Sequence, residues 1–438
     1  MGGGHHPQIW SAALGVTQTV YMNQVLTTHQ RSLSRKYLVY QTLSNLWFVS
    51  AIWLYFYRIF ITDQQVGLMD GFAFAIGLIA EVPSGALADR FGRDRIVKLG
   101  QLLAGTGFLI QAFGSSIAPF FVGQAIMMIG VAFVSGAEEA LFFRNLNFDR
   151  ASVQWRRLIT RGSQCALVGG LLATIAGGWL YAVNPRMPWV LTGLSLLGSI
   201  FIVWSVKDSR PEKHTHSFTT ELRKHLADIK AGFLQFGTPQ LWVYVPIILA
   251  VQGLFYAAGW GILRIVLLDR FYFTPFMGSV VIASSSLITV GVLAYMHKYA
   301  EHLSEKRVIV CISLSAVASL VLSLADIGVW GYVVIFSLYA GEHVLHPFMS
   351  ETLNSRAGED QRATVLSVAS FLRTLPYVLL APIIGYLNAH GNLEFFLMSW
   401  SLLIGMAVMV YLFSKKTDAH INLTKEEIGV DVRIPDLQ

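Results

Sequence analysis

The sequence predicts an all-α membrane protein with twelve transmembrane helices in two pseudo-symmetric six-helix bundles. Three observations support this prediction. Apolar segments of about 20 residues recur along the chain, Lys and Arg concentrate in alternate loops, and the second half repeats short features of the first.

The composition excludes an ordinary soluble protein. Of 438 residues, 54% are hydrophobic and only 13% are charged, whereas soluble domains have about 25% charged residues. The net charge of +6 comes mainly from Lys and Arg in loops between apolar segments, so we expect no nucleic-acid partner. The two cysteines, Cys165 and Cys311, lie inside apolar segments, and they predict no disulfide framework.

Twelve apolar segments lie between charged or Gly/Pro-containing breaks, and each is close to the length that crosses a bilayer. Their approximate ranges are 37–61, 65–88, 96–114, 117–142, 158–182, 188–206, 241–268, 274–297, 307–325, 328–350, 363–388 and 392–414.

The basic residues predict the orientation of these segments. Of 32 Lys and Arg residues, only Arg58, Arg186, Arg264 and Arg270 belong to the side of the odd-to-even loops. Because cytoplasmic loops are enriched in Lys and Arg, we expect both termini and the long central loop in the cytoplasm. The expected location is the cytoplasmic (inner) membrane.

This reading divides the chain into five parts. They are a cytoplasmic or interfacial extension (1–36), a first six-helix bundle (37–206), a cytoplasmic linker (207–240), a second six-helix bundle (241–414) and a cytoplasmic tail (415–438). In the linker, apolar residues from Phe218 to Phe233 recur at helical spacing, which predicts an amphipathic surface helix joining the halves. A binding site for a regulatory partner is the alternative.

An offset of about 206 residues aligns the two halves. GALA at Gly85 matches GVLA at Gly291, and GWL at Gly178 matches GYL at Gly385. Two six-helix repeats joined by a cytoplasmic loop are typical of transporters, whose ligand site lies between the repeats near the membrane midplane.

The stretch GALADRFGR, from Gly85 to Arg93, resembles the signature loop between helices 2 and 3 of the major facilitator superfamily. With the twelve segments and the repeat, the resemblance covers about 37–414, and it implies that family's fold and transport by alternating access. It also implies a conformational latch at the cytoplasmic mouth, with a topology anchor alone as the alternative. The latch residues are Gly85, Asp89, Arg90, Gly92 and Arg93.

Elementary chemistry agrees with a latch. Gly85 would allow helix 2 to pack closely against a neighbouring helix. Asp89 can accept hydrogen bonds from a facing helix N-terminus, and the arginines can pair with acids of helix 4 or with lipid phosphates.

Two positions depart from the family pattern. Asp94 stands where a second basic residue is usual, and Arg144 replaces an acid found in a related subgroup of drug-type exporters. We therefore expect Glu139, Asp149 or Asp94 to pair in the latch. Glu81–Gly85 (EVPSG) and Arg362–Ser367 (RATVLS) also resemble that subgroup, which does not fix a substrate.

Helix 5 keeps only part of the pattern of antiporters in this family. Gly169, Gly177 and Gly178 fit its glycine series, but Ala173 and Thr174 replace its Gly-Pro pair. Small-residue packing is therefore expected without a proline hinge.

Ionisable residues inside membrane helices are costly and usually functional. The candidates for coupling or substrate binding are Asp70, Glu138, Glu139, Arg264, Glu342, His343, His346 and Arg373. Glu342, His343 and His346 form the densest group, for which proton coupling, divalent-metal binding and helix–helix hydrogen bonding remain open. Either arginine can hold an anionic substrate group or the Glu342 carboxylate.

Aromatic and polar residues on helices 1 and 7 are candidates for lining a substrate cavity. They are Asn45, Trp47, Trp53, Tyr57, Gln252, Tyr256 and Trp260. The alternative for the tryptophans is anchoring at the membrane interface.

The sequence thus predicts a secondary active transporter for proton-coupled efflux of a drug-like or amphipathic compound. Alternatives are proton-coupled uptake of a metabolite or of a metal or siderophore complex, a transporter-like sensor, and a membrane metalloenzyme. No His-Glu-x-x-His or Gly-x-x-x-x-Gly-Lys-Ser/Thr motif occurs, so we expect neither an enzyme nor an ATP-driven pump, and no cofactor or metal. The expected partners are a small molecule, protons and lipids, and the expected state is a monomer.

Overall fold

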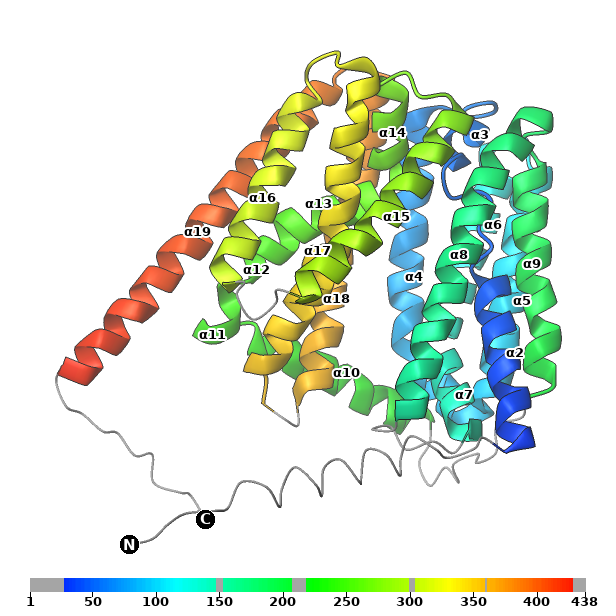
Figure 1. The fold of residues 1–438 in the computed structure, drawn as a ribbon, viewed down its shortest axis with the longest axis horizontal. Helices are drawn as coiled ribbons and strands as arrows, with labels where there is room; N and C mark the ends of the chain where they lie inside the picture. The colour runs from blue at the N-terminus through cyan, green and yellow to red at the C-terminus, as the bar shows by residue number, and fades with distance from the viewer. Residues whose placement is uncertain (1–26, 147–152, 207–217, 299–303, 359–360, 428–438) are drawn as a thin grey trace, which may run out of the picture.

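The computed structural model describes residues 27–146, 153–206, 218–298, 304–358 and 361–427. Regular structure in these ranges is helical, without a strand, which confirms the predicted all-α class. Figure 1 shows two groups of helices side by side, with α10 (Phe218–Gln235) along the lower edge between them.

The first group contains α2 (Thr28–Ser44), α3 (Trp53–Tyr57), α4 (Asp63–Phe91), α5 (Arg93–Phe113), α6 (Ile117–Val134), α7 (Ala137–Leu146), α8 (Val153–Val183) and α9 (Met187–Trp204). The second contains α11 (Pro239–Trp242), α12 (Val245–Ile247), α13 (Gly253–Gly259), α14 (Ile262–Arg270), α15 (Pro275–Lys298), α16 (Glu305–Leu322), α17 (Gly331–Arg356), α18 (Arg362–Ala389) and α19 (Leu393–Glu427). We call the end of the molecule near α7 and α10 the linker end, and the end near α3 and α14 the far end (Figure 1).

Nine helices in the described ranges are long and apolar enough to span a membrane. Of the other three predicted segments, 307–325 lies largely in α16 and 328–350 largely in α17, whereas 37–61 is helical only in parts, in α2 and α3. The chain is therefore a multi-pass membrane protein, and its helices fit the predicted arrangement in two bundles.

The first predicted segment is wrong in two respects. Its helix begins at Thr28, inside the expected extension 1–36, because Thr27 and Gln30 form reciprocal backbone–side-chain hydrogen bonds of 3.1 and 3.2 Å that cap it. The helix then ends at Ser44, and residues 45–52 form turns before α3. Residues 1–26 of the expected extension lie outside the described residues.

The fourth and seventh predicted segments are also interrupted. The fourth divides into α6 and α7 at Gly136, whose φ of +73° favours glycine. The seventh contains α11, α12, a π-helical turn at Ile248–Gln252, α13 and α14, with a break at Trp260 and Gly261. Such breaks expose backbone groups that need new partners in a membrane, where no water can replace them.

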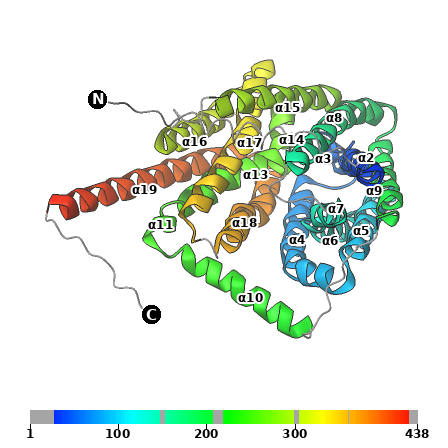
Figure 2. The ribbon, with the colours of Figure 1, turned by 60° about the horizontal axis from the view of Figure 1, so that its bottom comes forward.

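The linker helix occurs as predicted, from Phe218 to Gln235. It contacts both α4 and α18, and Figure 2 shows it crossing from one group of helices to the other. Phe233 packs edge-to-face on Phe371 at 5.6 Å between ring centroids. The first part of the expected tail, from 415, is helical, because α19 continues to Glu427.

Glycines bring the two groups into backbone contact near the far end. A β-carbon at Gly67 would collide with the Ala381 carbonyl, and one at Gly71 would lie 2.7 Å from the Val378 carbonyl oxygen and 2.8 Å from Pro382 Cδ. Gly178 of α8 similarly meets Phe276 of α15. Helices α4 and α18, and helices α8 and α15, can therefore approach as closely as membrane helices do at small residues.

Gly85, in contrast, is not at a close contact, and the prediction that it allows tight packing is wrong for this structure. No described atom lies within 4 Å of a β-carbon built at Gly85. The close approach of α4 to α18 occurs instead at Gly67 and Gly71, nearer the start of α4.

Substitution of Gly71 by Val tests this contact. We expect the free energy of unfolding to fall by about 1–3 kcal/mol, because the added methyl groups have no space beside the α18 backbone. Thermal unfolding of the purified protein in detergent measures the change. Gly198→Val in α9 is the matched control, since no described atom lies within 4 Å of a β-carbon there. Equal effects of the two substitutions would contradict the packing argument.

Candidate functional site

A cavity of about 610 Å³ lies between the two groups of helices, and we call it the central cavity. Most of its wall comes from the first group, and the second contributes residues of α13, α14, α15 and α17. Its volume is in the range of sites for drug-sized molecules. The charged or ionisable side chains Asp70, Glu138, Arg264 and His343 are on its wall.

Aromatic side chains cover much of this wall. All the aromatic candidates from the sequence are on it, namely Trp47, Trp53, Tyr57, Tyr256 and Trp260, together with Asn45. Trp47 packs against Phe108 at 5.4 Å between centroids, and Trp53 against Tyr57 at 6.0 Å. The prediction that Gln252 lines the cavity is wrong. Gln252 is buried in the π-helical turn and is not among the described residues that line the cavity.

Asp70 joins the two groups of helices through hydrogen bonds. Its Oδ1 accepts a bond of 3.1 Å from Gln124 of α6, and its Oδ2 accepts one from the Tyr377 hydroxyl of α18. The same hydroxyl accepts a bond of 2.8 Å from the Ile262 N–H at the start of α14. Asp70 is only 2% exposed, so this carboxyl group lies in the protein interior.

The two adjacent glutamates of α7 have different surroundings, as their helical spacing predicts. Glu138 is on the cavity wall and accepts a bond of 2.7 Å from the Tyr40 hydroxyl, which in turn accepts one of 2.8 Å from Gln101. Glu139 is exposed and does not line the cavity within the described residues. Glu138 is therefore the better placed of the two to meet a ligand.

Glu342 and Arg373 pair with each other. The Arg373 guanidinium donates to Glu342 Oε1, and it also lies 5.0 Å from the centroid of the Tyr256 ring. Both residues belong to the second group, and neither is among the described residues that line the central cavity. Arg373 was expected to hold either an anionic substrate group or the Glu342 carboxylate, and the structure favours the carboxylate.

The two histidines of α17 are placed differently from each other. His343 lines the cavity and stacks on Tyr339 at 4.3 Å between ring centroids, with Nδ1 2.9 Å from the Tyr339 carbonyl oxygen. His346 is half-buried and away from the described cavity wall. No group of three metal-ligating side chains occurs among the described residues, so the metal reading for this cluster gains no support.

The signature loop lies at the linker end, between α4 and α5. Gly92 has a φ of +92° and joins the two helices directly. Arg93 pairs with Asp89 at 2.9 Å, and Lys98 pairs with Asp94 at 2.9 Å. These bonds stay within the loop and the first turns of α5. The wider latch, including Arg90, remains a prediction, and Asp149 lies outside the described residues.

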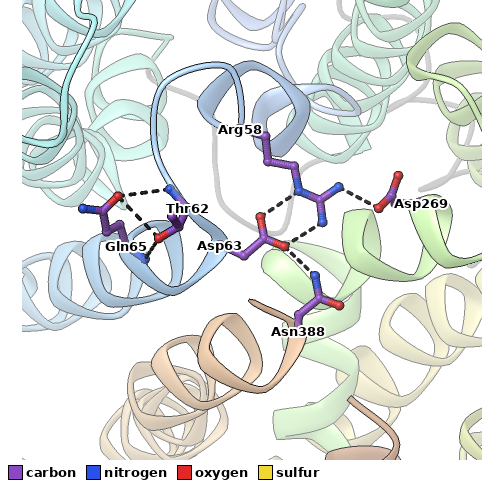
Figure 3. Close-up of polar contacts among 6 residues, drawn as sticks. All are labelled: Arg58, Thr62, Asp63, Gln65, Asp269 and Asn388. Atoms are coloured by element: carbon purple, nitrogen blue, oxygen red, sulfur yellow. Dashed lines mark hydrogen bonds and ion pairs between the residues drawn. The ribbon is translucent and has the colours of Figure 1, made fainter. Parts of the chain in front are cut away.

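A polar cluster at the far end was not predicted from the sequence. We call it the outer clamp and define it as Arg58, Asp63, Asp269 and Asn388. Arg58 holds both carboxylate oxygens of Asp63 at 2.7 Å and also contacts Asp269 at 2.8 Å (Figure 3). Asn388 donates to Asp63 as well. Arg58 and Asp63 belong to the first group of helices and Asp269 and Asn388 to the second, so the cluster connects the two groups.

Two signals in the sequence indicated this cluster indirectly. Arg58 is one of the few basic residues assigned to that side, and Asp63 follows it by five residues in a short loop. Nothing in the sequence placed Asp269 and Asn388 beside them, since they are more than 200 residues away.

Two helical bundles around a shared cavity near the middle of the membrane are the architecture of secondary transporters. The sequence model of the Major Facilitator Superfamily matches residues 37–381, so the chain belongs to this family. This match confirms the resemblance read from the signature loop.

Relatives and solved structures agree with this membership. Multidrug resistance protein 2 of Bacillus subtilis (strain 168) is 23% identical over 79% of this chain and 86% of its own length. Quinolone resistance protein NorA of Staphylococcus aureus (strain MSSA476) is 23% identical over 72% of this chain and 80% of its own. Crystal structures of a nucleoside transporter NupG variant and of a peptide transporter POT variant with sulfate share the fold. The NupG variant has a TM-score of 0.69 at 10% identity and covers 87% of this chain and 99% of its own. The POT variant has a TM-score of 0.69 at 14% identity and covers 92% of this chain and 98% of its own.

Replacement of Tyr377 by Phe tests the bridge between the two groups. Loss of the hydroxyl leaves the Ile262 N–H and one Asp70 oxygen without their partner, so we expect a loss of about 1–3 kcal/mol in unfolding free energy. Thermal unfolding in detergent measures it. Tyr386→Phe is the control on the same helix, because that side chain is 48% exposed. A melting temperature unchanged by Tyr377→Phe would argue against a structural bridge.

Proposed function

We propose that this protein is a secondary active transporter that exports drug-like or amphipathic small molecules by alternating access, coupled to protons. The observation that carries the proposal is the central cavity, which both groups of helices line and which has the carboxyl groups of Asp70 and Glu138 on its wall. The printed names of two relatives, which refer to multidrug and quinolone resistance, favour export over uptake.

The arrangement of contacts supports a state closed at the far end. The outer clamp and the Gly67, Gly71 and Gly178 contacts connect the two groups there, whereas Gly85 has free space in the inner part of α4. The excess of basic residues in the loops of the linker end favours a cytoplasmic location for that end. The described state is then the inward-facing state of the proposed cycle.

Asp70 and Glu138 are the groups that we propose for proton coupling. Both line the cavity, and each carboxylate is bonded to a tyrosine hydroxyl that belongs to a different helix. Protonation of either one would change a hydrogen bond between helices, and in the case of Asp70 a bond between the two halves. A proton taken up there can therefore alter the balance between conformations.

Transport assays in liposomes test this function. With an imposed proton gradient, the wild-type protein should move a fluorescent lipophilic cation or a fluorescent aromatic carboxylate, in a gradient-dependent manner. Asp70→Asn and Glu138→Gln should each remove most of the gradient dependence, because neither new side chain can exchange a proton. Asp326→Asn, at an exposed position of the far end, is the control and should transport normally.

Gradient-independent flux in the wild type, or unchanged coupling in both variants, would refute the assignment of coupling to these acids. The sign of the gradient that drives accumulation inside the vesicles distinguishes export from uptake.

Arg58→Gln tests the role of the outer clamp. Half-exposed ion pairs contribute about 0.5–1 kcal/mol, so far-end opening should rise roughly two- to fivefold when the clamp is removed. The readout is labelling of Ala283→Cys on the cavity wall by an impermeant thiol reagent applied from the far end, with Cys165 and Cys311 replaced by Ala.

Arg270→Gln is the matched control for this experiment. Arg270 lies at the same end, but its partners Glu394, Ser323 and Leu324 all belong to the second group. The same labelling rate in the Arg58 and Arg270 variants would rule out a specific role for the clamp in closure.

A further inference from the structure

Arg264 is a buried cation on the wall of the central cavity. It lies in the first turn of α14 and is only 5% exposed. Its guanidinium donates a bond of 2.7 Å to the Gly259 carbonyl oxygen and one of 2.6 Å to the Ser50 carbonyl oxygen. The Ser50 carbonyl lies in the turns before α3 and the Gly259 carbonyl at the end of α13, beside the second break. They belong to different halves of the molecule, so Arg264 is fixed in place by the backbone on both sides.

The charge of Arg264 has no counter-ion within the described part of the chain. Its two bonds go to neutral carbonyl groups, and its buried Nε has no hydrogen-bond partner there. Five other arginines differ in this respect, since each pairs with a carboxylate: Arg58, Arg93, Arg270, Arg356 and Arg373. A guanidinium stays charged in proteins, so a buried one favours an anion beside it.

Two buried carboxyl groups of the protein pair with groups other than Arg264. Asp70 accepts bonds from Gln124 and Tyr377, and Glu342 is held by Arg373. The flat side chains of Trp260, Tyr256 and Trp53 share the cavity wall with Arg264. A guanidinium beside aromatic surfaces matches a ligand that combines a planar anion with an aromatic body.

We propose that Arg264 forms an anion subsite in the central cavity, and that the transported molecules include aromatic or amphipathic compounds bearing a carboxylate. This inference rests on the proposed transport function and specifies its substrate class. The guanidinium donates to the carboxylate, and the aromatic wall packs against the body of the molecule.

The test compares pyrenebutyrate with its neutral primary amide, which has the same aromatic body. Binding to the full-length protein in lipid nanodiscs is followed by energy transfer from tryptophan to pyrene. The wild type should bind the carboxylate about tenfold more tightly than the amide, as a charge-assisted hydrogen bond predicts. Arg264→Gln should abolish this preference, and Arg264→Lys should keep part of it, because lysine retains the charge without the planar fork.

Arg186→Gln is the matched control. Arg186 also donates to two backbone carbonyls, those of Ala112 and Gly114, but it is not among the described residues of the cavity wall. This variant should keep the wild-type preference. If Arg264→Gln fails to fold, the wild type and Arg264→Lys still decide the question.

Equal binding of acid and amide by the wild type, or a preference that survives in Arg264→Gln, would overturn the anion subsite and leave the proposed transport function intact. Binding of neither compound by the wild type would overturn the proposal of aromatic cargo, and the subsite with it.

Discussion

The backbone contact between α4 and α18 determines much of what surrounds it. At Gly67 and Gly71 the absence of side chains lets α4 lie directly on the α18 backbone. The same approach brings Asp70 within reach of Tyr377, and it brings Asp63 within reach of Asn388. Without that contact, α4 and α18 would lie too far apart for these hydrogen bonds between the halves to form. The central cavity would then be less closed at the far end.

Polar groups in this protein are satisfied mainly across helix boundaries. A membrane interior supplies no water to broken backbone segments, so each break in a spanning helix needs a partner from the protein. Arg264 serves two breaks at once, through the carbonyls of Ser50 and Gly259. The Tyr377 hydroxyl also serves the second of these breaks, through the Ile262 N–H. These irregular segments line or adjoin the cavity, where non-helical backbone is tolerated at membrane depth.

The features predictable from sequence were those with a local chemical pattern. Apolar length, the positions of Lys and Arg, and the helical spacing from Phe218 to Phe233 led to the class, the family and the linker helix. The breaks near Asn45 and Trp260 were missed, because an apolar segment of the right length reads as a continuous helix whether or not its backbone is interrupted. Asn45 was a weak signal, since asparagine is favoured at helix ends.

The candidate site was less predictable, because it depends on pairs far apart in the chain. Aromatic residues of helices 1 and 7 were expected at a cavity from their composition and position, and they line the central cavity. A single sequence does not show how each helix is rotated about its axis. That rotation determines the pairing of Glu342 with Arg373, the position of Gln252 away from the cavity wall and the partners of Asp70. Gly85 illustrates the same limit. A glycine in a helix shows that close packing is possible there, but the sequence does not show which glycines lie at a close contact.

The outer clamp is built from charges that remain partly in contact with solvent, with the Asp269 side chain 51% exposed. Attraction between such charges weakens as dissolved ions accumulate around them, over a screening length of about 8–10 Å at physiological ionic strength. The buried bond between Asp70 and Tyr377 has no such sensitivity. In the proposed orientation, the salt concentration outside the cell would therefore act on the outer clamp more than on the buried contacts of the far end, and dilute surroundings would favour closure.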